Sequence, residues 1–88
     1  GIVNMPLQIQ GTRLSISLRE DTEKPLIRVS LRSVDDFPCN KMAEQFFNGG
    51  GHLNASGGSL KMTIEQARQQ ALKALEAYKD LLSDTPAK

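Results

Sequence analysis

The chain has 88 residues, a net charge of +1 at neutral pH and 39% hydrophobic residues, which fits one small globular domain. A protein that coats nucleic acid needs a strong basic excess, because its affinity comes from neutralising phosphates. Any nucleic acid bound here must therefore be short or held at an end. No apolar run approaches the roughly 20 residues of a membrane span, and we expect no signal peptide. Cys39 is the single cysteine, which excludes an internal disulfide and favours a cytoplasmic location.

The sequence is expected to fold as one domain over residues 1–82, followed by a polar, frayed tail at 83–88. It starts with an apolar residue at position 2 and without an initiator methionine. We therefore expect it to be a piece of a longer protein. No internal repeat and no low-complexity segment divides it.

Two strands are predicted at residues 13–19 and 26–33, because apolar and polar residues alternate there with the two-residue period of a half-buried strand. Residues 20–25 are charged and include a proline, which predicts an exposed hairpin loop. One face of the pair is apolar and predicts the core: Leu14, Ile16, Leu18, Ile27, Val29 and Leu31. The opposite face is polar: Arg13, Ser15, Ser17, Arg19, Arg28, Ser30 and Arg32. This polar face is either a solvated surface or a surface that meets a ligand.

A short helix is predicted at residues 39–48, after a turn at 35–38. Its apolar residues recur at helical spacing and would pack on the sheet. The helix must stop at Gly49, because glycine favours the chain reversal at a helix end. A third strand is expected within residues 55–60, which are rich in small side chains.

A long helix is predicted at about 64–82. Thr63 and Gln66 form the pattern of a capping box at its start. One apolar stripe along the helix predicts its buried side: Ile64, Ala67, Ala71, Leu75, Tyr78 and Leu82, with Leu72, Ala74 and Leu81 beside it. The predicted fold is α+β, a small mixed or antiparallel sheet covered on one side by this long C-terminal helix and the short central helix.

Residues 49–58 contain most of the chain's seven glycines and its one histidine, His52. Such a stretch costs backbone entropy, so it predicts positive φ angles or a very close backbone approach. Consecutive glycines let several amides converge on one anion, and the imidazole of His52 adds a donor. A Walker loop is excluded, since Gly-Lys-Ser/Thr is absent and the glycines follow a helix. The segment alone is compatible both with an anion-binding loop and with a flexible turn after a capping glycine.

Three segments together, residues 28–33, 40–43 and 47–58, resemble the DHH-associated C-terminal domain of DHH-family phosphoesterases. The most specific part is Gly49-Gly50-Gly51-His52 followed by Ala55-Ser56-Gly57, with Arg32-Ser33 upstream. The resemblance extends over about residues 1–80 and is strongest for the nanoRNase-like branch. The family also includes RecJ-type exonucleases, cyclic-dinucleotide phosphodiesterases and exopolyphosphatase-like proteins.

This resemblance implies a division of labour between two domains. In the family, a larger N-terminal domain holds divalent metal ions, usually Mn²⁺ (or Mg²⁺), and the associated domain closes over the substrate. The resemblance implies that Arg32 and His52 contact substrate phosphate or the terminal nucleotide. It extends the substrate-binding set to Ser33, Gly49, Gly50, Gly51, Asn54, Ala55, Ser56 and Gly57, with Arg28 and Asn40 as additional candidates. It implies no catalytic residue, metal ligand or cofactor in this chain.

Neither an Asp-His-His nor an Asp-x-Asp motif occurs, and Asp35-Asp36 predicts a turn. The chain alone is therefore expected to be inactive. Its expected partners are a short single-stranded nucleic acid or nucleotide phosphate and the DHH domain. No membrane partner is expected, and a homodimer is possible for the whole protein. Alternatives are a stand-alone RNA-binding or dimerisation module, like that attached to alanyl-tRNA synthetases, and a purely structural domain. The substrate is open among oligoribonucleotide, phosphoadenosine phosphate, cyclic dinucleotide, single-stranded DNA and polyphosphate.

Overall fold

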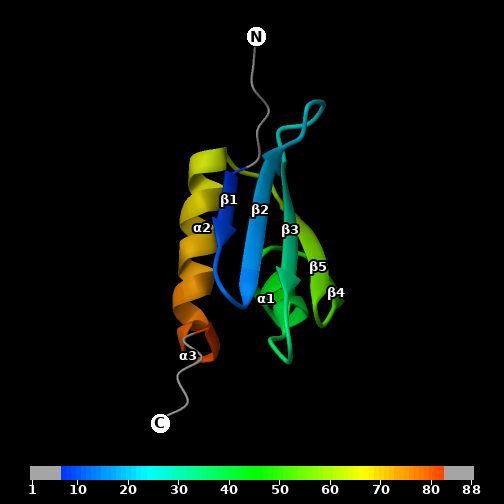
Figure 1. The fold of residues 1–88 in the computed structure, drawn as a ribbon. Helices are drawn as coiled ribbons and strands as arrows, with labels where there is room; N and C mark the ends of the chain where they lie inside the picture. The colour runs from blue at the N-terminus through cyan, green and yellow to red at the C-terminus, as the bar shows by residue number, and fades with distance from the viewer. Residues whose placement is uncertain (1–6, 83–88) are drawn as a thin grey trace.

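The computed structural model describes residues 7–82, which form one sheet and three helices. In chain order the elements are β1 (Leu7–Gln10), β2 (Leu14–Glu20), β3 (Ile27–Ser33), α1 (Cys39–Phe46), β4 (Gly50–His52), β5 (Ala55–Leu60), α2 (Ile64–Ala77) and α3 (Lys79–Leu82). The strands follow the order β1-β2-β3-β5-β4, and all neighbouring strands are antiparallel (Figure 1). The predicted α+β class is therefore confirmed.

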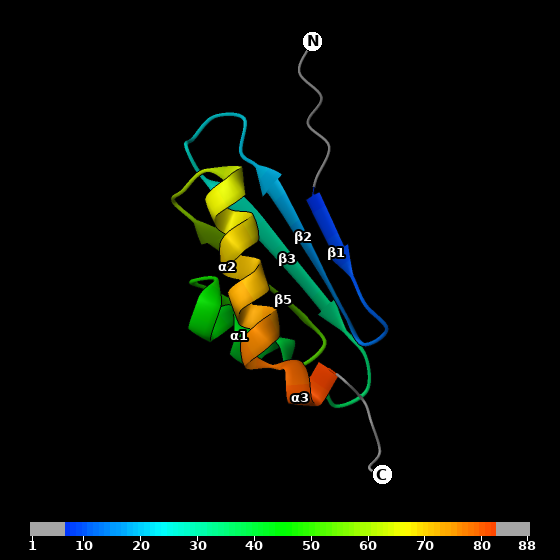
Figure 2. The ribbon, with the colours of Figure 1, turned by 90° about the vertical axis from the view of Figure 1, so that its left-hand side faces the viewer.

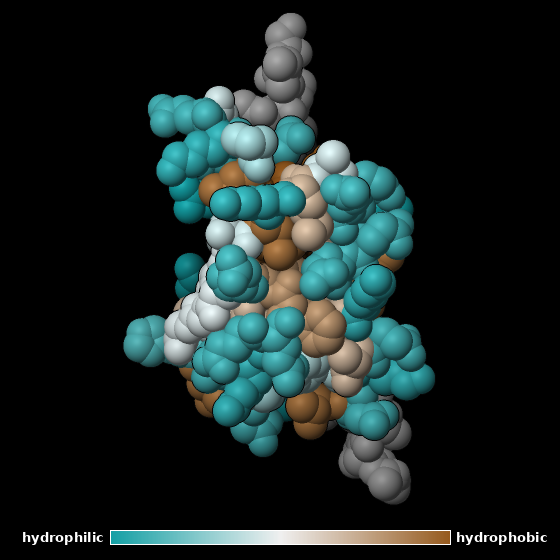
Figure 3. All heavy atoms as spheres, turned by 180° about the vertical axis from the view of Figure 1, so that it is seen from behind, coloured by the Kyte–Doolittle hydropathy of each residue, from teal (hydrophilic) through white to brown (hydrophobic). Residues whose placement is uncertain are grey.

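Helices α1 and α2 lie on the same side of the sheet, as predicted (Figures 1 and 2). From that side, apolar side chains form a band between hydrophilic surfaces (Figure 3). The opposite side faces the viewer in Figure 1 and carries no helix within the described residues. We call it the helix-free face; on β2 and β3 it consists of Ser15, Ser17, Arg19, Arg28, Ser30 and Arg32.

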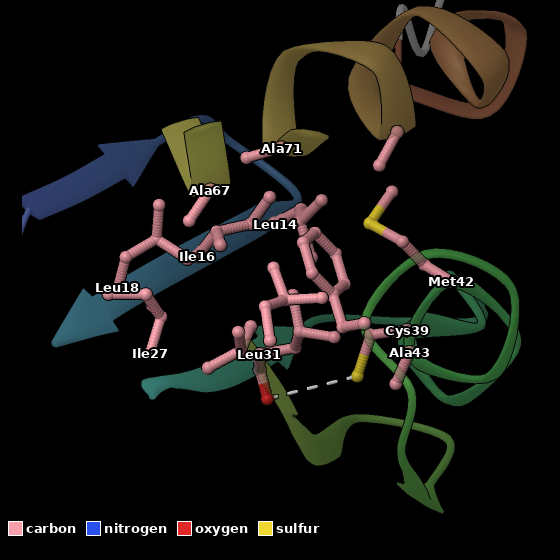
Figure 4. Close-up of a cluster of buried hydrophobic side chains, with 14 of the residues drawn as sticks. Leu14, Ile16, Leu18, Ile27, Leu31, Cys39, Met42, Ala43, Ala67 and Ala71 are labelled. Carbon is pink, nitrogen blue, oxygen red and sulfur yellow. Dashed lines mark hydrogen bonds between the residues drawn. The ribbon is translucent and has the colours of Figure 1, made fainter. Parts of the chain in front are cut away.

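The helix-covered face holds the core, and the predicted apolar positions of β2 and β3 all belong to it. Each of these six side chains is at most 4% exposed: Leu14, Ile16, Leu18, Ile27, Val29 and Leu31. The rest of the core comes from β5, from the two helices and from the segments beside α1: Phe37, Cys39, Met42, Ala43, Phe47, Leu60, Ala67, Ala71 and Ala74 (Figure 4). Burying a large apolar side chain contributes roughly 1.5–3 kcal/mol. Burial of this cluster therefore determines which face of the sheet the helices cover and which face is exposed to solvent.

Helix α2 begins at the predicted capping box. The amide of Gln66 donates to the hydroxyl of Thr63 (3.1 Å), and the amide of Thr63 donates to the side-chain oxygen of Gln66 (3.0 Å). The residues that the helix buries are small, which lets it approach the sheet closely: Ala67, Ala71 and Ala74. The capping box thus fixes the residue at which the helix starts.

The predicted helix over 64–82 is in fact two helices. Helix α2 ends at Ala77, where the amide of Tyr78 bonds back to the carbonyl oxygens of Ala74 and Leu75, and the separate helix α3 follows. The stripe prediction is confirmed for Ala67 and Ala71, which are buried. Of the residues predicted beside the stripe, Ala74 is also buried, whereas Leu72 and Leu81 are 42% and 48% exposed.

Helix α1 also ends earlier than predicted, at Phe46 instead of residue 48. The chain reverses at Asn48, which has a left-handed φ of 53°. Asparagine adopts this conformation more readily than most residues because its short polar side chain bonds locally. The amide of Gly49 then donates to the carbonyl oxygen of Ala43 (3.1 Å). The reversal predicted at Gly49 therefore happens one residue earlier. Gly49 itself permits a close backbone contact with Gly57.

Strands β1 and β4 are absent from the sequence prediction. β1 pairs with β2 at the edge of the sheet, with Leu7 opposite Leu18 and Ile9 opposite Ile16. β4 pairs with β5 at the other edge. β1 has only 4 residues, and the glycines of β4 carry no side chains that could alternate. Neither strand therefore leaves a clear periodic signal.

Arg13 does not lie on the helix-free face, contrary to the prediction. Its Nη2 is 2.9 Å from Oδ1 of Asp36, and its Nη1 donates to the carbonyl oxygen of Leu81 in α3 (3.3 Å). The side chain is only 17% exposed. The reason is that β2 begins at Leu14, so the alternation of the strand does not extend back to Arg13.

Residues 1–6 and 83–88 lie outside the described residues. The expected cut at the start and the frayed tail at the end therefore stay predictions. Within residues 7–82, no helix is both long enough and apolar enough to span a bilayer.

Candidate functional site

Strand pairing brings Arg32 and His52 into one row on the helix-free face. Arg32 of β3 is paired with Ala55 of β5, and Ala55 is paired with His52 of β4. Cross-strand partners point to the same side of a sheet, so the backbones of Arg32 and His52 lie two strand spacings, about 10 Å, apart. Only the methyl group of Ala55 stands between them. On its other side Arg32 is paired with Ser15 of β2.

Arg32 and His52 are exposed, and neither side chain forms a hydrogen bond or ion pair within residues 7–82. A guanidinium group is a planar fork that matches two phosphate oxygens. An imidazole N–H donates a further hydrogen bond. Two unsatisfied donors on either side of a small residue are suited to an anion the size of a phosphate.

The turn after α1 packs directly on β5, and this contact requires glycine on both sides. A Cβ on Gly49 would lie 1.9 Å from the carbonyl oxygen of Gly57, and a Cβ on Gly58 would lie 2.0 Å from that of Phe47. The amide of Ser59 donates to the same Phe47 oxygen (2.9 Å). These glycines therefore seat the end of α1 on the sheet and fix the point at which β4 begins.

Gly50 and Gly51 belong to an extended edge strand, Gly50–His52, where the sequence is compatible with an anion-binding loop or a flexible turn. Gly51 has φ of 150°, and a Cβ there would lie 2.8 Å from the carbonyl oxygen of Ala55. Gly50 has more room, since its nearest neighbour would be Cγ of Glu44 at 3.6 Å. The strand carries the histidine to the end of a tight hairpin, opposite Ala55. The glycines therefore position the imidazole through the backbone.

Ser33 and Asn54, both predicted to bind substrate, bond to each other. Nδ2 of Asn54 donates to Oγ of Ser33 (3.0 Å) and to the carbonyl oxygen of Asp35 (3.1 Å). The Ser33 hydroxyl in turn donates to the carbonyl oxygen of Phe37 (2.8 Å), with that of Leu53 at 3.1 Å. We call this network the Ser33–Asn54 clamp. It ties the end of β3 to the turn between β4 and β5, directly beside the Arg32 row.

The backbone of His52 is held by two further side chains. The hydroxyl of Ser56 donates to the carbonyl oxygen of His52 (2.7 Å), and the buried thiol of Cys39 lies 3.8 Å from the same oxygen. The amide of Cys39 donates to the carbonyl oxygen of Leu53 (3.0 Å). Ser56, predicted to bind substrate, is paired with the core residue Leu31 and restrains the histidine backbone from within the domain.

The other predicted candidates lie outside this row. Arg28 is on the helix-free face, four residues along β3, and its Nε is 3.1 Å from Oδ2 of Asp21. Asn40 is on α1, and its Oδ1 is buried without a hydrogen-bond partner in the described residues. Gly57 lies in the next row, opposite Ser30. Ser15 was predicted on this face but not at the site; only the pairing register places it beside Arg32.

Metal-binding groups do not gather here. Among residues 7–82, no cluster of three or more His, Cys, Asp or Glu side chains could hold a metal ion. A hollow of about 940 Å³ lies between the β2–β3 loop and the start of α2. It is lined by residues such as Lys24, Met62 and Ile64 and does not include the Arg32 row. The arrangement at the row can bind and orient an anion.

A five-stranded antiparallel sheet with helices on one face defines the fold class of this domain. The family model of the DHHA1 domain matches residues 1–80, and the chain therefore belongs to this family. The chain is also similar to an exopolyphosphatase-related protein from Bacteroides fragilis, with 55% identity, a TM-score of 0.78 and 86% of this chain covered. It spans 22% of the length of that protein. A search of curated proteins found no match. The predicted family resemblance is confirmed.

Proposed function

We propose that this chain is the substrate-binding domain of a DHH-family phosphoesterase and holds the phosphate end of a nucleotide or short single-stranded nucleic acid. The row of Arg32, Ala55 and His52 carries the proposal, because it offers two exposed donors without partners in the described residues, one on each side of a methyl group. Arg32 takes two phosphate oxygens, and the imidazole of His52 donates to a third.

The domain contributes binding and orientation. Divalent ions, Mn²⁺ or Mg²⁺, would be held by the DHH domain and would supply Lewis-acid chemistry there. The residues of this chain hold the phosphate at a fixed place, since the Ser33–Asn54 clamp and Ser56 restrain the backbone on either side of the row. A phosphate held in one orientation lowers the entropic cost of any reaction at that group. The isolated chain is therefore proposed to bind without hydrolysing.

Polyphosphate is the second candidate ligand, because the similar protein from Bacteroides fragilis is described as exopolyphosphatase-related. Inorganic polyphosphate offers the same phosphate oxygens to Arg32 and His52 as a nucleotide does. It lacks the sugar and the base. Comparing a nucleoside monophosphate with tripolyphosphate therefore separates the two ligands at one site.

The test is calorimetric titration of the chain with adenosine monophosphate and with tripolyphosphate. Arg32→Ala removes a charge-assisted contact of roughly 1.5–3 kcal/mol, which corresponds to a loss of affinity of about 10-fold to 150-fold. His52→Ala is expected to lower affinity less. Lys73→Gln is the matched control, because Lys73 is an exposed cation on α2, on the other side of the sheet. It removes the same charge and should leave affinity unchanged.

Two results would contradict the proposal. One is unchanged affinity for both ligands in the Arg32→Ala/His52→Ala double variant. The other is tight binding of long duplex with a steep salt dependence, which indicates many phosphate contacts and favours an RNA-binding module. In the whole protein, activity with Mn²⁺ on oligoribonucleotide, phosphoadenosine phosphate, cyclic dinucleotide, single-stranded DNA and polyphosphate then identifies the substrate.

A further inference from the structure

Two arginines face each other at the far end of the helix-free face. Arg19 of β2 is directly paired with Arg28 of β3. Like charges directly opposite on neighbouring strands destabilise a sheet. Arg28 has an acidic partner in Asp21 (3.1 Å), but Arg19 has no ion-pair or hydrogen-bond partner within residues 7–82. The positive charge of Arg19 is therefore not neutralised by a partner in the described residues, and it does not stabilise the fold.

The contact between Asp21 and Arg28 orients the guanidinium and leaves most of its donors open. Oδ2 of Asp21 accepts from Nε of Arg28, while Oδ1 accepts from the amides of Glu23 (2.7 Å) and Lys24 (3.2 Å). The carboxylate is thus fixed by the β2–β3 loop. Because only Nε is engaged, the terminal N–H groups of Arg28 are available, and its side chain is 52% exposed.

Arg19 and Arg28 line one shallow hollow of about 320 Å³ together with Glu20, Asp21 and Thr22. The charge of Asp21 is already committed to Arg28 and to two amides. Glu20 is paired with Ile27 and so belongs to the row of the covered face. The positive charge of Arg19 is therefore not balanced at this hollow. An anion bound there would contact the guanidinium groups of both Arg19 and Arg28.

This hollow and the Arg32 row lie at two points along strand β3, on the same face. Arg28 and Arg32 are four residues apart on β3 and point to the same side, which places them about 13 Å apart along the strand. The row between them carries small groups, namely Ser17, Ser30 and Gly57. An extended ligand that lies along β3 therefore meets arginine at both ends and hydroxyl groups in the middle.

We propose that Arg19 and Arg28 form a second phosphate-binding position, so that the helix-free face holds a short single-stranded oligonucleotide across two separated phosphates. The proposal rests on the proposed function, which supplies the first phosphate at Arg32 and His52. The middle of the face, which carries no charged side chain between Arg28 and Arg32 on β2, β3 and β5, favours a nucleotide chain over inorganic polyphosphate. Polyphosphate would place charge continuously over the middle of the face, where only hydroxyl and hydrogen groups are present, whereas sugars there can bond to serine hydroxyls.

The test compares binding of adenosine monophosphate and of a 5′-phosphorylated tetra-adenylate to the chain and its variants. Arg19→Gln/Arg28→Gln should weaken the tetranucleotide about 10-fold or more and leave the mononucleotide unchanged. The slope of log affinity against log salt for the tetranucleotide should become shallower by roughly 0.7 for each phosphate that the variant no longer neutralises. Arg32→Gln should weaken both ligands. Lys73→Gln is again the charge-matched control.

The single variant Arg19→Gln keeps the test valid if the double variant is unstable, because Arg19 has no partner to lose in the described residues. Equal losses for both ligands, or no loss for either, would overturn the second position and leave the proposed function standing. Tripolyphosphate binding as tightly as the tetranucleotide, with the same loss in the double variant, would overturn the choice of ligand. If neither nucleotide binds the wild-type chain, the proposed function itself fails.

Discussion

The two faces of the sheet use the same strands in opposite ways. On the covered face, six side chains of β2 and β3 are apolar and at most 4% exposed, and no polar residue is buried among residues 7–82. On the helix-free face the same strands carry serines and arginines, and Arg19 and Arg32 lack partners within that range. Stability is therefore concentrated on one face, and the other face is free to vary its charge without unfolding the domain.

The glycine segment belongs to both faces, and its members divide between them. Gly49 and Gly58 serve the covered face, because each permits a backbone contact that a Cβ would block. His52 serves the helix-free face, where it is paired with Ala55. A substitution within this segment should therefore affect either stability or binding, according to the face on which it acts.

The largest expected effect is on stability, from Gly49→Ala. The new Cβ would lie 1.9 Å from a backbone oxygen, which no side-chain rotation can relieve. We expect the free energy of unfolding to fall by about 3 kcal/mol, the upper part of the range for overpacking. Urea denaturation measures it.

Gly50→Ala is the matched control, one residue away. Its Cβ would meet Cγ of Glu44 at 3.6 Å, an ordinary contact. Alanine also restricts the unfolded chain, so the free energy of unfolding should stay the same or rise by about 0.5 kcal/mol. Equal losses in the two variants would show that the segment needs glycine for general flexibility, and the division between the faces would be wrong.

A smaller effect is expected from Ser33→Ala, which breaks the Ser33–Asn54 clamp. The hydroxyl donates to the carbonyl oxygen of Phe37, lies 3.1 Å from that of Leu53 and accepts from Asn54. Its loss should lower the free energy of unfolding by about 1–2 kcal/mol, because partly buried groups lose their partner. Affinity for adenosine monophosphate should change much less than in Arg32→Ala.

Ser30→Ala on the same strand is the control for this clamp variant. Ser30 is exposed on the helix-free face, so its removal should leave stability within about 0.5 kcal/mol. If Ser33→Ala abolishes binding while stability is unchanged, then Ser33 contacts the ligand directly, as the sequence alone suggested.

The sequence predicts the covered face well because side-chain periodicity reports burial. The alternation in β2 and β3 and the capping box at Thr63 are local patterns, and the structure confirms each one. The clamp is not local, since Ser33 meets Leu53 and Asn54, some 20 residues later. Ser33 and Asn54 belong to the family motif, but the motif does not tell whether they contact a ligand or bond to each other. Only the three-dimensional arrangement distinguishes these two roles.

The edge strand β4 is a second feature that could not be predicted from the sequence. Glycine has no side chain, so a strand made of glycines has no alternation to detect. Gly49-Gly50-Gly51 therefore resembles a loop, and its sequence is compatible both with anion binding by its amides and with a flexible turn. In the structure Gly50–His52 is paired with β5, and the amide of Gly49 is bonded to Ala43. What the sequence does identify is the histidine at the end of this strand.

The smallest expected effect is on the pH dependence of the helix-free face at Asp21. The amide of Glu23, more than the guanidinium of Arg28, lowers the pKa of Asp21 below its ordinary value of 3.8. A carboxyl whose pKa is depressed by folding contributes stability above its unfolded pKa and loses it as the pH falls through its folded pKa. The β2–β3 loop should therefore stay ordered through mild acid and loosen only in strong acid, when Asp21 takes up a proton and releases Arg28.

An NMR titration from neutral to strongly acidic pH, following the side-chain carbon of Asp21 and the amides of Glu23 and Lys24, measures this pKa. Asp21→Asn should abolish the titration and leave the core unaffected, because Asp21 contacts only the loop and Arg28. A pKa at or above the ordinary value would mean that the loop does not hold the carboxylate. Arg28 would then lack its fixed orientation, and the contrast between an ordered covered face and a preorganised helix-free face would weaken at this end of the sheet.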